Sequence, residues 1–365
     1  MSNITFSYSV IFGCLLTLSQ WIWADRLFQP AIEQAAPERS LLLAISRAGD
    51  RLVAAGEQGV IIYSDDEALT WQQARVPSST LLTAVHFFGK QTGWAVGHDG
   101  VVLHTQDGGQ SWVMQLDGAK VNQLRVDAVT AELQYQRSLE TVDPDRLENL
   151  GYQLDDAKAA LDGAPSTPLL DLFFVDAQTG YAVGAYGLFL VTHDGGQHWR
   201  YKGQILPNPD SLHLNRIIKT KQGRLLILGE AGLLMQSEDK GENWQAIDLP
   251  YQGSFFSTVE ADDGLYLMGL RGTVLKRSVD NEGVAVWDYV DSGLTATIND
   301  SVIIGHHAYL VGQGGALLKK QGDSFEPFLQ RGLRSYSAVE SVGHYLVVVG
   351  EGGVSRIDVS GGAGK

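Results

Sequence analysis

The chain repeats one short glycine pattern seven times, and this repeat limits the possible folds more than any other feature. Each copy follows an apolar run and reads Gly-x-x-Gly, as in AAGEQG, AVGHDG and LVGQGG. The first glycines of the copies are Gly56, Gly97, Gly184, Gly229, Gly269, Gly312 and Gly350. The copies are about forty residues apart, except for one interval of about twice that length. Units of this length with three or four short strands predict an all-β, seven-bladed β-propeller.

An octet follows the third predicted strand in several units. TQDGGQSW, THDGGQHW and SEDKGENW share the pattern [Ser/Thr]-x-Asp-x-Gly-x-x-Trp. Their Asp and Trp residues are Asp107 and Trp112, Asp194 and Trp199, and Asp239 and Trp244. A short Asp side chain accepts hydrogen bonds from its own turn, and the Trp buries a large ring at the start of the next strand. The octet is therefore predicted to be a structural joint without acid–base function, and it resembles the Asp box of BNR propellers.

A fourth octet, SDDEALTW, ends at Trp71 and lacks the Gly. Because Gly supplies the positive φ that such a turn requires, we expect this turn to be looser than the other three.

The long interval contains an insertion at residues 113–167. Two stretches, 119–140 and 144–161, carry apolar residues at helical spacing, and Asp143-Pro144 is a favourable helix start. This predicts an antiparallel helical hairpin on the Gly-x-x-Gly face, opposite the octets. Its apolar stripes either pack against each other or bind a partner.

The last unit stops after its third predicted strand, near GGVSRIDV. The segment Asp25–Ile32 is a candidate for the missing outer strand, which would close the ring and remove two exposed edges. The propeller is thus predicted to span residues 25–358, with a flexible tail at residues 359–365.

The N-terminus reads as an export signal. Residues 1–24 contain no charged side chain and end in an apolar stretch before Ala24, which predicts a signal peptide and an extracytoplasmic location such as the periplasm. A retained membrane anchor and lipidation at Cys14 are the alternatives. Cys14 is the only cysteine, so a mature chain would have no disulfide and no Cys-ligated metal.

Composition and motifs argue against several functions. The net charge of −15 makes nucleic acid an unfavourable partner. No zinc-protease, phosphate-loop or serine-hydrolase motif is present in the sequence, so no cofactor, metal site or catalytic residue is expected.

The residues of the Gly-x-x-Gly turns and of the loops that enter the inner strands vary while the frame repeats, which suits a binding face. We expect binding residues at His98, Asp99, Tyr186, Arg271, Arg331 and Arg334. The other residues placed on this face are Glu57, Glu230, Gln313, Glu351, Asn208, Asp210, Tyr251 and Asp291. Arg271 and Arg334 stand out because a guanidinium group offers a planar donor fork to carboxylates.

The units TGWAVGHDGVVLHTQDGGQSW and TGYAVGAYGLFLVTHDGGQHW resemble the photosystem II stability/assembly factor family. The resemblance covers roughly residues 40–358. It implies an exported seven-bladed propeller that acts as a non-enzymatic assembly factor and binds a membrane-complex subunit through an Arg-rich face. We also expect a monomer that is peripheral to the membrane. The acidic charge and the hairpin depart from that pattern.

Asp boxes also occur in sialidases and other glycoside hydrolases, so a glycan-active or glycan-binding propeller is the alternative. Such an enzyme needs two carboxylates about 5–10 Å apart. Glu57, Asp99, Glu230 and Glu351 are candidates, but their spacing selects no pair, and an Arg-Ile-Pro element typical of sialidases is absent from the sequence.

Overall fold

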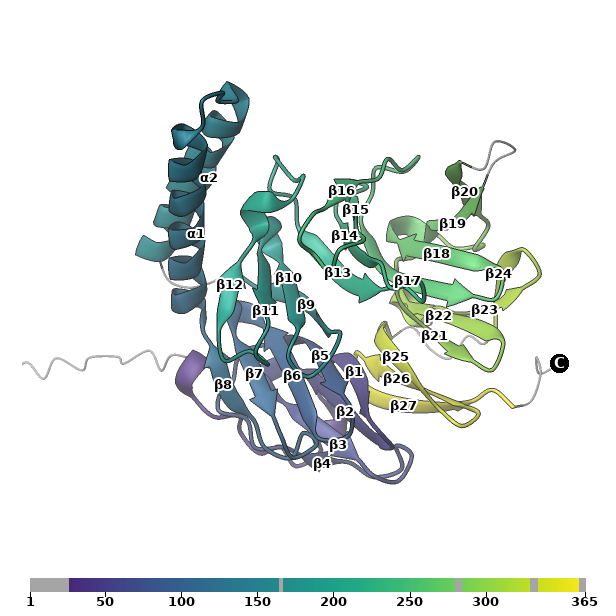
Figure 1. The fold of residues 1–365 in the computed structure, drawn as a ribbon. Helices are drawn as coiled ribbons and strands as arrows, with labels where there is room; N and C mark the ends of the chain where they lie inside the picture. Colours follow the sequence, from purple (N-terminus) through teal and green to yellow (C-terminus); the bar gives the residue numbers. More distant parts are fainter. Residues whose placement is uncertain (1–25, 164–166, 280–283, 329–333, 361–365) are drawn as a thin grey trace, which may run out of the picture.

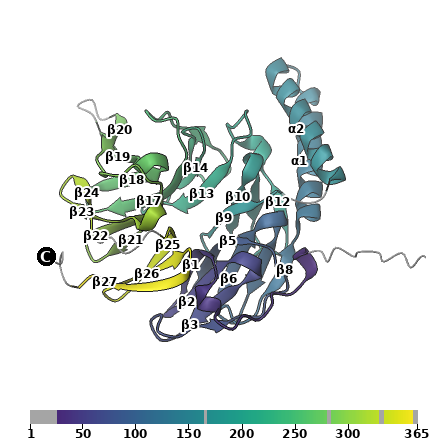
Figure 2. The same cartoon turned by 180° about the vertical axis from the view of Figure 1, so that it is seen from behind.

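Seven antiparallel sheets form a ring of blades (Figures 1 and 2), as the repeat predicts. The computed structural model describes residues 26–163, 167–279, 284–328 and 334–360. The predicted signal peptide, Arg331 and residues 361–365 of the predicted tail lie outside the described residues.

Among the described residues, six blades have four strands and the last has three. The first three blades are β1 (Leu42–Ala48), β2 (Arg51–Gly56), β3 (Ile61–Ser64) and β4 (Gln72–Gln73); β5 (Leu82–Phe88), β6 (Thr92–Gly97), β7 (Val102–Thr105) and β8 (Val113–Leu116); and β9 (Leu169–Phe174), β10 (Gly180–Gly184), β11 (Phe189–Thr192) and β12 (Trp199–Tyr201). Blades four and five are β13 (Leu214–Lys219), β14 (Leu225–Gly229), β15 (Leu234–Ser237) and β16 (Gln245–Ala246); and β17 (Phe255–Ala261), β18 (Gly264–Gly269), β19 (Val274–Val279) and β20 (Ala285–Val290). Blades six and seven are β21 (Ile298–Ile304), β22 (His307–Gly312), β23 (Leu317–Gln321) and β24 (Ser324–Pro327); and β25 (Tyr336–Val342), β26 (Tyr345–Gly350) and β27 (Gly353–Asp358).

The repeated glycines set the register of each inner strand. In the second blade, Leu82 at the start of β5 pairs with Gly97 at the end of β6, and a bulge follows at Thr83. A Cβ on Gly97 would lie 2.1 Å from the Leu81 carbonyl oxygen, so no other residue fits there. The Thr83 hydroxyl, within the bulge, donates a 2.7 Å hydrogen bond to Leu169 O and so ties this blade to the next.

The ring closes through packing of β1 on β25. Leu42 from the first blade is buried in one cluster with Ala338 and Val349 from the last. The expectation that Asp25–Ile32 supplies an outer strand to the last blade is wrong, because residues 26–32 pack elsewhere. Ala31 N donates to Val76 O at 3.0 Å, in the loop after β4. The backbone groups of this segment find partners in the first blade, so the last blade keeps three strands among the described residues.

Each Asp-box carboxylate is bound within its own loop. Asp107 Oδ1 accepts hydrogen bonds of 2.9 Å from the backbone N–H groups of Gln110 and Ser111. The Trp112 indole donates to Gly109 O at 3.1 Å and closes the loop. Asp194 and Asp239 accept from the backbone at the equivalent position, His198 N and Asn243 N, also at 2.9 Å.

A donor from the preceding blade fixes three of these loops to the ring. The guanidinium of Arg51 donates to Gly108 O, the Trp94 indole donates to Gly195 O, and the Tyr181 hydroxyl donates to Lys240 O, at 3.0, 3.1 and 2.7 Å. All three acceptors are the fourth residue of an octet. The Asp boxes therefore join neighbouring blades as well as strands within one blade.

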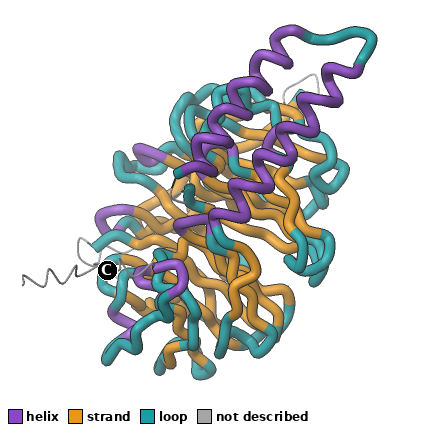
Figure 3. The backbone as a smooth tube through the Cα atoms, turned by 90° about the vertical axis from the view of Figure 1, so that its left-hand side faces the viewer, coloured by secondary structure: helices purple, strands orange, loops and turns teal. Residues whose placement is uncertain are grey.

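The helical insertion forms the predicted hairpin of α1 (Gly118–Ser138) and α2 (Pro144–Asp162). Asp117 and Asp143 cap the two N-termini, and α1 begins beside the turn His98–Gly100, on the predicted face. Figure 3 shows its distal end extending beyond the strands.

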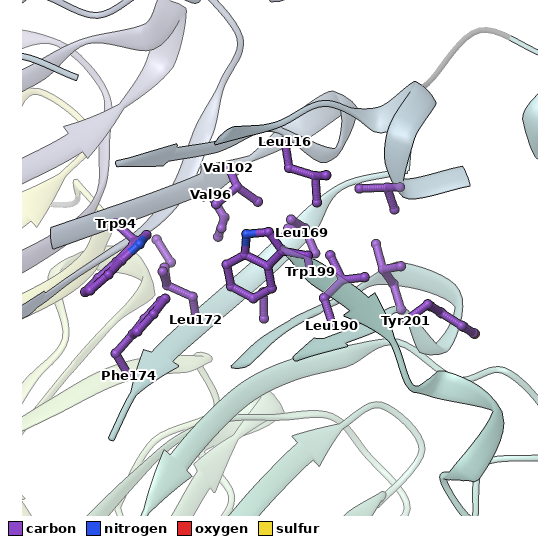
Figure 4. Packing of buried hydrophobic residues seen from close by; sticks show 14 of the residues in the cluster. Trp94, Val96, Val102, Leu116, Leu169, Leu172, Phe174, Leu190, Trp199 and Tyr201 are labelled. Carbon is purple, nitrogen blue, oxygen red and sulfur yellow. The ribbon is translucent and has the colours of Figure 1, made fainter. Parts of the chain in front are cut away.

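The apolar stripes of the hairpin pack on each other and also on the third blade. Val129 and Leu150 are buried in the cluster that holds Leu190, Trp199 and Tyr201 (Figure 4). This packing consumes most of the two stripes, and the large apolar side chains that stay exposed on the hairpin are Tyr135, Leu139 and Tyr152.

The octet that lacks Gly keeps the carboxylate hydrogen bonds of the other three. Its Trp71 indole, unlike those of Trp112 and Trp244, is buried without a hydrogen-bond partner in the described part of the chain. Asp66 Oδ1 accepts hydrogen bonds from Leu69 N at 3.1 Å and Thr70 N at 2.8 Å. Glu67 and Ala68 adopt the left-handed conformation, with φ of 59° and 66°. The hydrogen bonds of the box thus compensate for the strain of two L-residues at positive φ, about 1–2 kcal/mol each.

Ala68→Gly should stabilise the protein by roughly 0.5–1 kcal/mol, because relief of the φ strain exceeds the entropy that Gly adds to the unfolded chain. Chemical denaturation measures the change. Ala131→Gly, in the middle of α1, should destabilise by about 1 kcal/mol. A loss of stability in Ala68→Gly like that of Ala131→Gly would contradict the account.

The Asp boxes should make stability fall in acid. Hydrogen bonds from Thr70, His198 and Asn243 lower the pKa of Asp66, Asp194 and Asp239 to about 2. The unfolded carboxyls keep a pKa near 4, so their contribution is present above about pH 4 and is lost as the pH falls towards 2. The triple variant Asp66→Asn, Asp194→Asn, Asp239→Asn should show a smaller drop in its urea midpoint over this range. An equal drop would contradict the assignment.

Candidate functional site

The Gly-x-x-Gly turns, together with the loops that enter the inner strands, form one face of the ring, here called the turn face. The second of the two residues between the glycines of each Gly-x-x-Gly turn has a left-handed backbone conformation in all seven blades. The non-glycine residues at this position are Gln58, Asp99, Tyr186, Ala231 and Arg271, with φ between 53° and 58°. Such conformations persist only where the surrounding structure holds them. Here they place variable side chains at the exposed tips of a fixed frame.

In three blades the residue directly after the first glycine of the turn is a glutamate with a structural role, which was not predicted from the sequence. Glu57 Oε1 accepts from Leu41 N at 2.8 Å, Glu230 Oε1 from His213 N at 2.7 Å, and Glu351 Oε2 from Ser335 N at 3.2 Å. In each case the donor directly precedes an inner strand. Three of the four carboxylates considered for glycoside hydrolysis are therefore bound to backbone amides.

Two arginines of the turn face remain available. Arg271 and Arg334 are exposed, and among the described residues no acidic side chain forms an ion pair with either guanidinium. The Arg334 guanidinium lies over the turn of the last blade, where a Cβ on Gly352 would be 2.1 Å from Arg334 Nη1. Gly352 thus makes the space in which this side chain rests.

Tyr186 adds an aromatic ring to the turn face. Its side chain is 56% exposed, and its ring packs edge-on against His213 with centroids 4.8 Å apart. The Tyr186 backbone N–H donates to His213 Nδ1 at 3.1 Å, which orients both rings. His98 is exposed as well, and Asp99 is half-buried.

Several other residues placed on this face serve the loops themselves. The Asn208 side chain bridges to both backbone groups of Leu212, and the Tyr251 hydroxyl donates to Leu270 O. Asp291 accepts from Gly293 N. Asp210 and Gln313 are exposed.

The seven inner strands enclose a central channel with a cavity of about 490 Å³. It contains a charged triad that the sequence analysis missed. Arg216 Nε lies 3.5 Å from Asp171 Oδ2, and Arg216 Nη2 lies 3.3 Å from Asp300 Oδ1. The three residues hold equivalent register positions, directly after the bulge of their strands. Comparing the inner strands position by position would have brought them together.

The channel triad joins blades on several sides of the ring. Asp171 Oδ2 also accepts from Ile217 N at 2.9 Å, and Asp300 Oδ2 accepts from Val339 N at 3.0 Å. Burial raises the pKa of Asp171 to about 6, although Arg216 opposes the shift. Each carboxylate already accepts a backbone hydrogen bond and faces one guanidinium, which is the arrangement of an internal tie between blades.

Within the described residues, no cluster of His, Cys, Asp and Glu offers three ligands to a metal ion. In the same part of the chain, neither long helix is apolar over enough of its length to cross a bilayer.

The sequence matches a family model described as photosynthesis system II assembly factor YCF48, over residues 64–135 and 157–254. A relative, the photosystem II assembly lipoprotein Ycf48 of Synechococcus sp. (strain CC9902), is 37% identical over 81 residues. This alignment covers 22% of the chain and 24% of the relative, so the chain matches about a quarter of that protein's length.

Solved structures share the fold at low sequence identity. YCF48 bound to D1 peptide superposes with a TM-score of 0.62 at 16% identity, over 91% of this chain and 100% of the other. YCF48 from Cyanidioschyzon merolae gives 0.60 at 14% identity, over 90% and 98%. The WD40 propeller domain of Doa1 gives 0.57 at 11%, over 92% and 97%. These similarities establish the propeller architecture.

Arg216→Met should destabilise the protein by about 3 kcal/mol at pH 8, the lower end for breaking a buried ion pair, because the channel leaves the triad partly hydrated. The loss should be smaller at pH 5. The Arg216 charge opposes the rise in the pKa of Asp171, so in the variant this pKa rises further and the carboxyl is protonated at pH 5, which removes the unpaired buried charge. Urea unfolding at both pH values measures this. Arg200→Met, at an exposed position of the third blade, is the control, and a loss that does not depend on pH would contradict the account.

Proposed function

We propose that this chain, a photosystem II assembly factor-like propeller by its repeats and fold, is a non-enzymatic assembly or stability factor that binds a subunit of a membrane complex on its turn face. The observation that carries the proposal is the availability of Arg271 and Arg334. Both guanidinium groups are exposed on a face whose glutamates are already bound to backbone amides.

The chemistry of this face suits an acidic or carboxylate-bearing protein segment. A guanidinium group binds carboxylates through two parallel hydrogen bonds. Tyr186 offers an exposed aromatic ring on the same turn face as the two arginines. His98 and Asp99 add polar groups with some exposure. Arg331 belongs to the same proposed set by its place in the sequence.

The location and state of the protein are part of the proposal. An exported, extracytoplasmic protein such as a periplasmic one, peripheral to the membrane and monomeric, agrees with the apolar N-terminal segment and with the lipoprotein relative. The segment of residues 1–24 would act as the signal peptide, and the propeller would span residues 25–358 with the hairpin inserted at 113–167.

A glycan-active or glycan-binding propeller is the second candidate. It is favoured only by the Asp boxes, and those carboxylates are consumed by their own loops. The absence of a free pair of glutamates in the described turns also weighs against hydrolysis.

The double variant Arg271→Ala, Arg334→Ala should recover at least tenfold less of its membrane-protein partners in a pull-down from solubilised envelope membranes. Loss of two charge-assisted contacts at about 1.5–3 kcal/mol each predicts a larger effect than this, and partial exposure reduces it. Recovery is measured by quantitative mass spectrometry. The double variant Arg200→Ala, Arg75→Ala removes two exposed arginines elsewhere and is the matched control.

Equal recovery by the wild type and the Arg271, Arg334 variant would place the binding surface elsewhere. Turnover of a fluorogenic glycoside panel that is abolished by one carboxylate substitution would replace the proposal with the enzymatic alternative.

A further inference from the structure

A groove between the fourth and fifth blades contains two arginines that form no ion pair with an acidic side chain of the described residues. It lies beside the turns that begin β14 and β18, on the side of the ring opposite the turn face. Two adjoining cavities of about 330 and 420 Å³ share Arg224, Leu265 and Arg277 as lining residues. Their sizes are in the range of small-molecule sites.

Arg224 has an internal reference in Arg51, which holds the same place in the first blade. Each arginine directly precedes the strand residue that pairs with the octet's first serine, Ser64 or Ser237. Arg51 donates two hydrogen bonds of 2.7 Å to Asp65 and a third to Gly108 O in the following blade. All the groups that satisfy this guanidinium come from its own octet and the next one.

Among the described residues, Arg224 has neither kind of partner. Glu238 stands where Asp65 does, and its carboxylate accepts instead from Gln236 at 3.1 Å. The fifth blade has SVDNEGVAVW in place of an octet. Among the described residues, no hydrogen bond or ion pair satisfies the Arg224 guanidinium, and its Nε is buried without a partner.

Arg277 lies close enough to Arg224 for the two positive charges to repel each other. Burial, and then the charge of Arg224, lowers the pKa of Arg277. The acidic groups that the structure describes near the groove form no ion pair with either arginine. Glu260 accepts from Lys221 N at 2.7 Å, Asp262 lies 2.8 Å from His306, and Asp248 is exposed and pairs with neither arginine.

An apolar wall adjoins the two guanidinium groups. Arg277 pairs directly with Trp287 across β19 and β20, so the two side chains share a face of the sheet. Trp287 is half-buried and, with Leu226 and Leu265, belongs to the apolar cluster that fills the space between the blades.

We infer that this groove binds a monocarboxylate with an aromatic or branched apolar body. Its carboxylate lies between Arg224 and Arg277, and its body packs on Trp287 and the leucines. An anion supplies the negative charge that Asp65 supplies to Arg51, and a planar carboxylate matches the fork of a guanidinium group. The site is separate from the turn face, so it adds a ligand to a protein whose proposed partner binds elsewhere.

Calorimetry with 3-phenylpropionate, its primary amide and inorganic phosphate tests the inference. The acid should bind at least tenfold more tightly than the amide and than phosphate. Arg224→Gln, Arg277→Gln and Trp287→Ala should each weaken binding of the acid at least tenfold. Arg51→Gln changes the matched arginine and should leave binding unchanged. The carboxylate could belong to a peptide C-terminus or to a small acid, and the tetrapeptide Ala-Ala-Ala-Phe with a free or an amidated C-terminus distinguishes the two. If the free-ended peptide binds more tightly than 3-phenylpropionate, the ligand is a chain terminus. If it binds more weakly, the ligand is a small acid.

Thermal unfolding gives an independent measurement. Arg224→Gln should leave the melting temperature unchanged or raise it, because it removes one member of a like-charged pair, whereas Arg51→Gln should lower it. Equal binding of acid and amide, binding of phosphate as tight as that of the acid, or no effect of the Arg224 and Arg277 variants on binding would overturn the inference. So would equal losses of stability in Arg224→Gln and Arg51→Gln.

Discussion

The propeller depends on a close approach of two backbones at the first glycine of each Gly-x-x-Gly turn. At all seven glycines a Cβ would lie between 2.0 and 2.4 Å from the carbonyl oxygen of the residue before the inner strand. The N–H of the following residue donates to that same carbonyl in every blade. This contact fixes the register of the inner strand. It leaves the second residue between the two glycines in the left-handed region. The contact that builds each blade therefore also determines which side chains the turn face presents.

The blades share one frame, so their differences are informative wherever a repeated partner is missing. Arg51 and Arg224 hold the same place, yet one is fully satisfied by its octet and by the next, and the other is not. The central channel also shows a difference between blades at one repeated position, the residue after the bulge of the inner strand. Three blades have alanine there, Ala44, Ala84 and Ala338. Three others have the charged residues Asp171, Arg216 and Asp300. A charged residue at one such position would be costly, and three together satisfy one another.

The periodic features could be predicted from the sequence because each is local. Strand, turn and octet recur within one unit, and the hairpin follows from helical spacing with an Asp-Pro start. The misses depend on partners that are distant in sequence. Residues 26–32 pack on the first blade because Val76 O is available there, and Glu57 binds a backbone amide that precedes its inner strand. The octet without Gly is a local exception: Asp66 keeps its hydrogen bonds to Leu69 N and Thr70 N although two L-residues stand at positive φ, which propensity alone does not reveal.

Net charge is a weak guide to what such a scaffold binds. A chain with a net charge of −15 repels anions at long range, but at physiological salt that field decays over about 8 Å. Within that distance an anion meets the local guanidinium groups, Arg271 or Arg334 on the turn face and Arg224 with Arg277 in the groove. Acidic partners should then associate without electrostatic acceleration and depend on contacts that slow dissociation. The acidic composition disfavours the extended phosphate backbone of nucleic acid, and it is compatible with single carboxylates that reach one pair of arginines at a time.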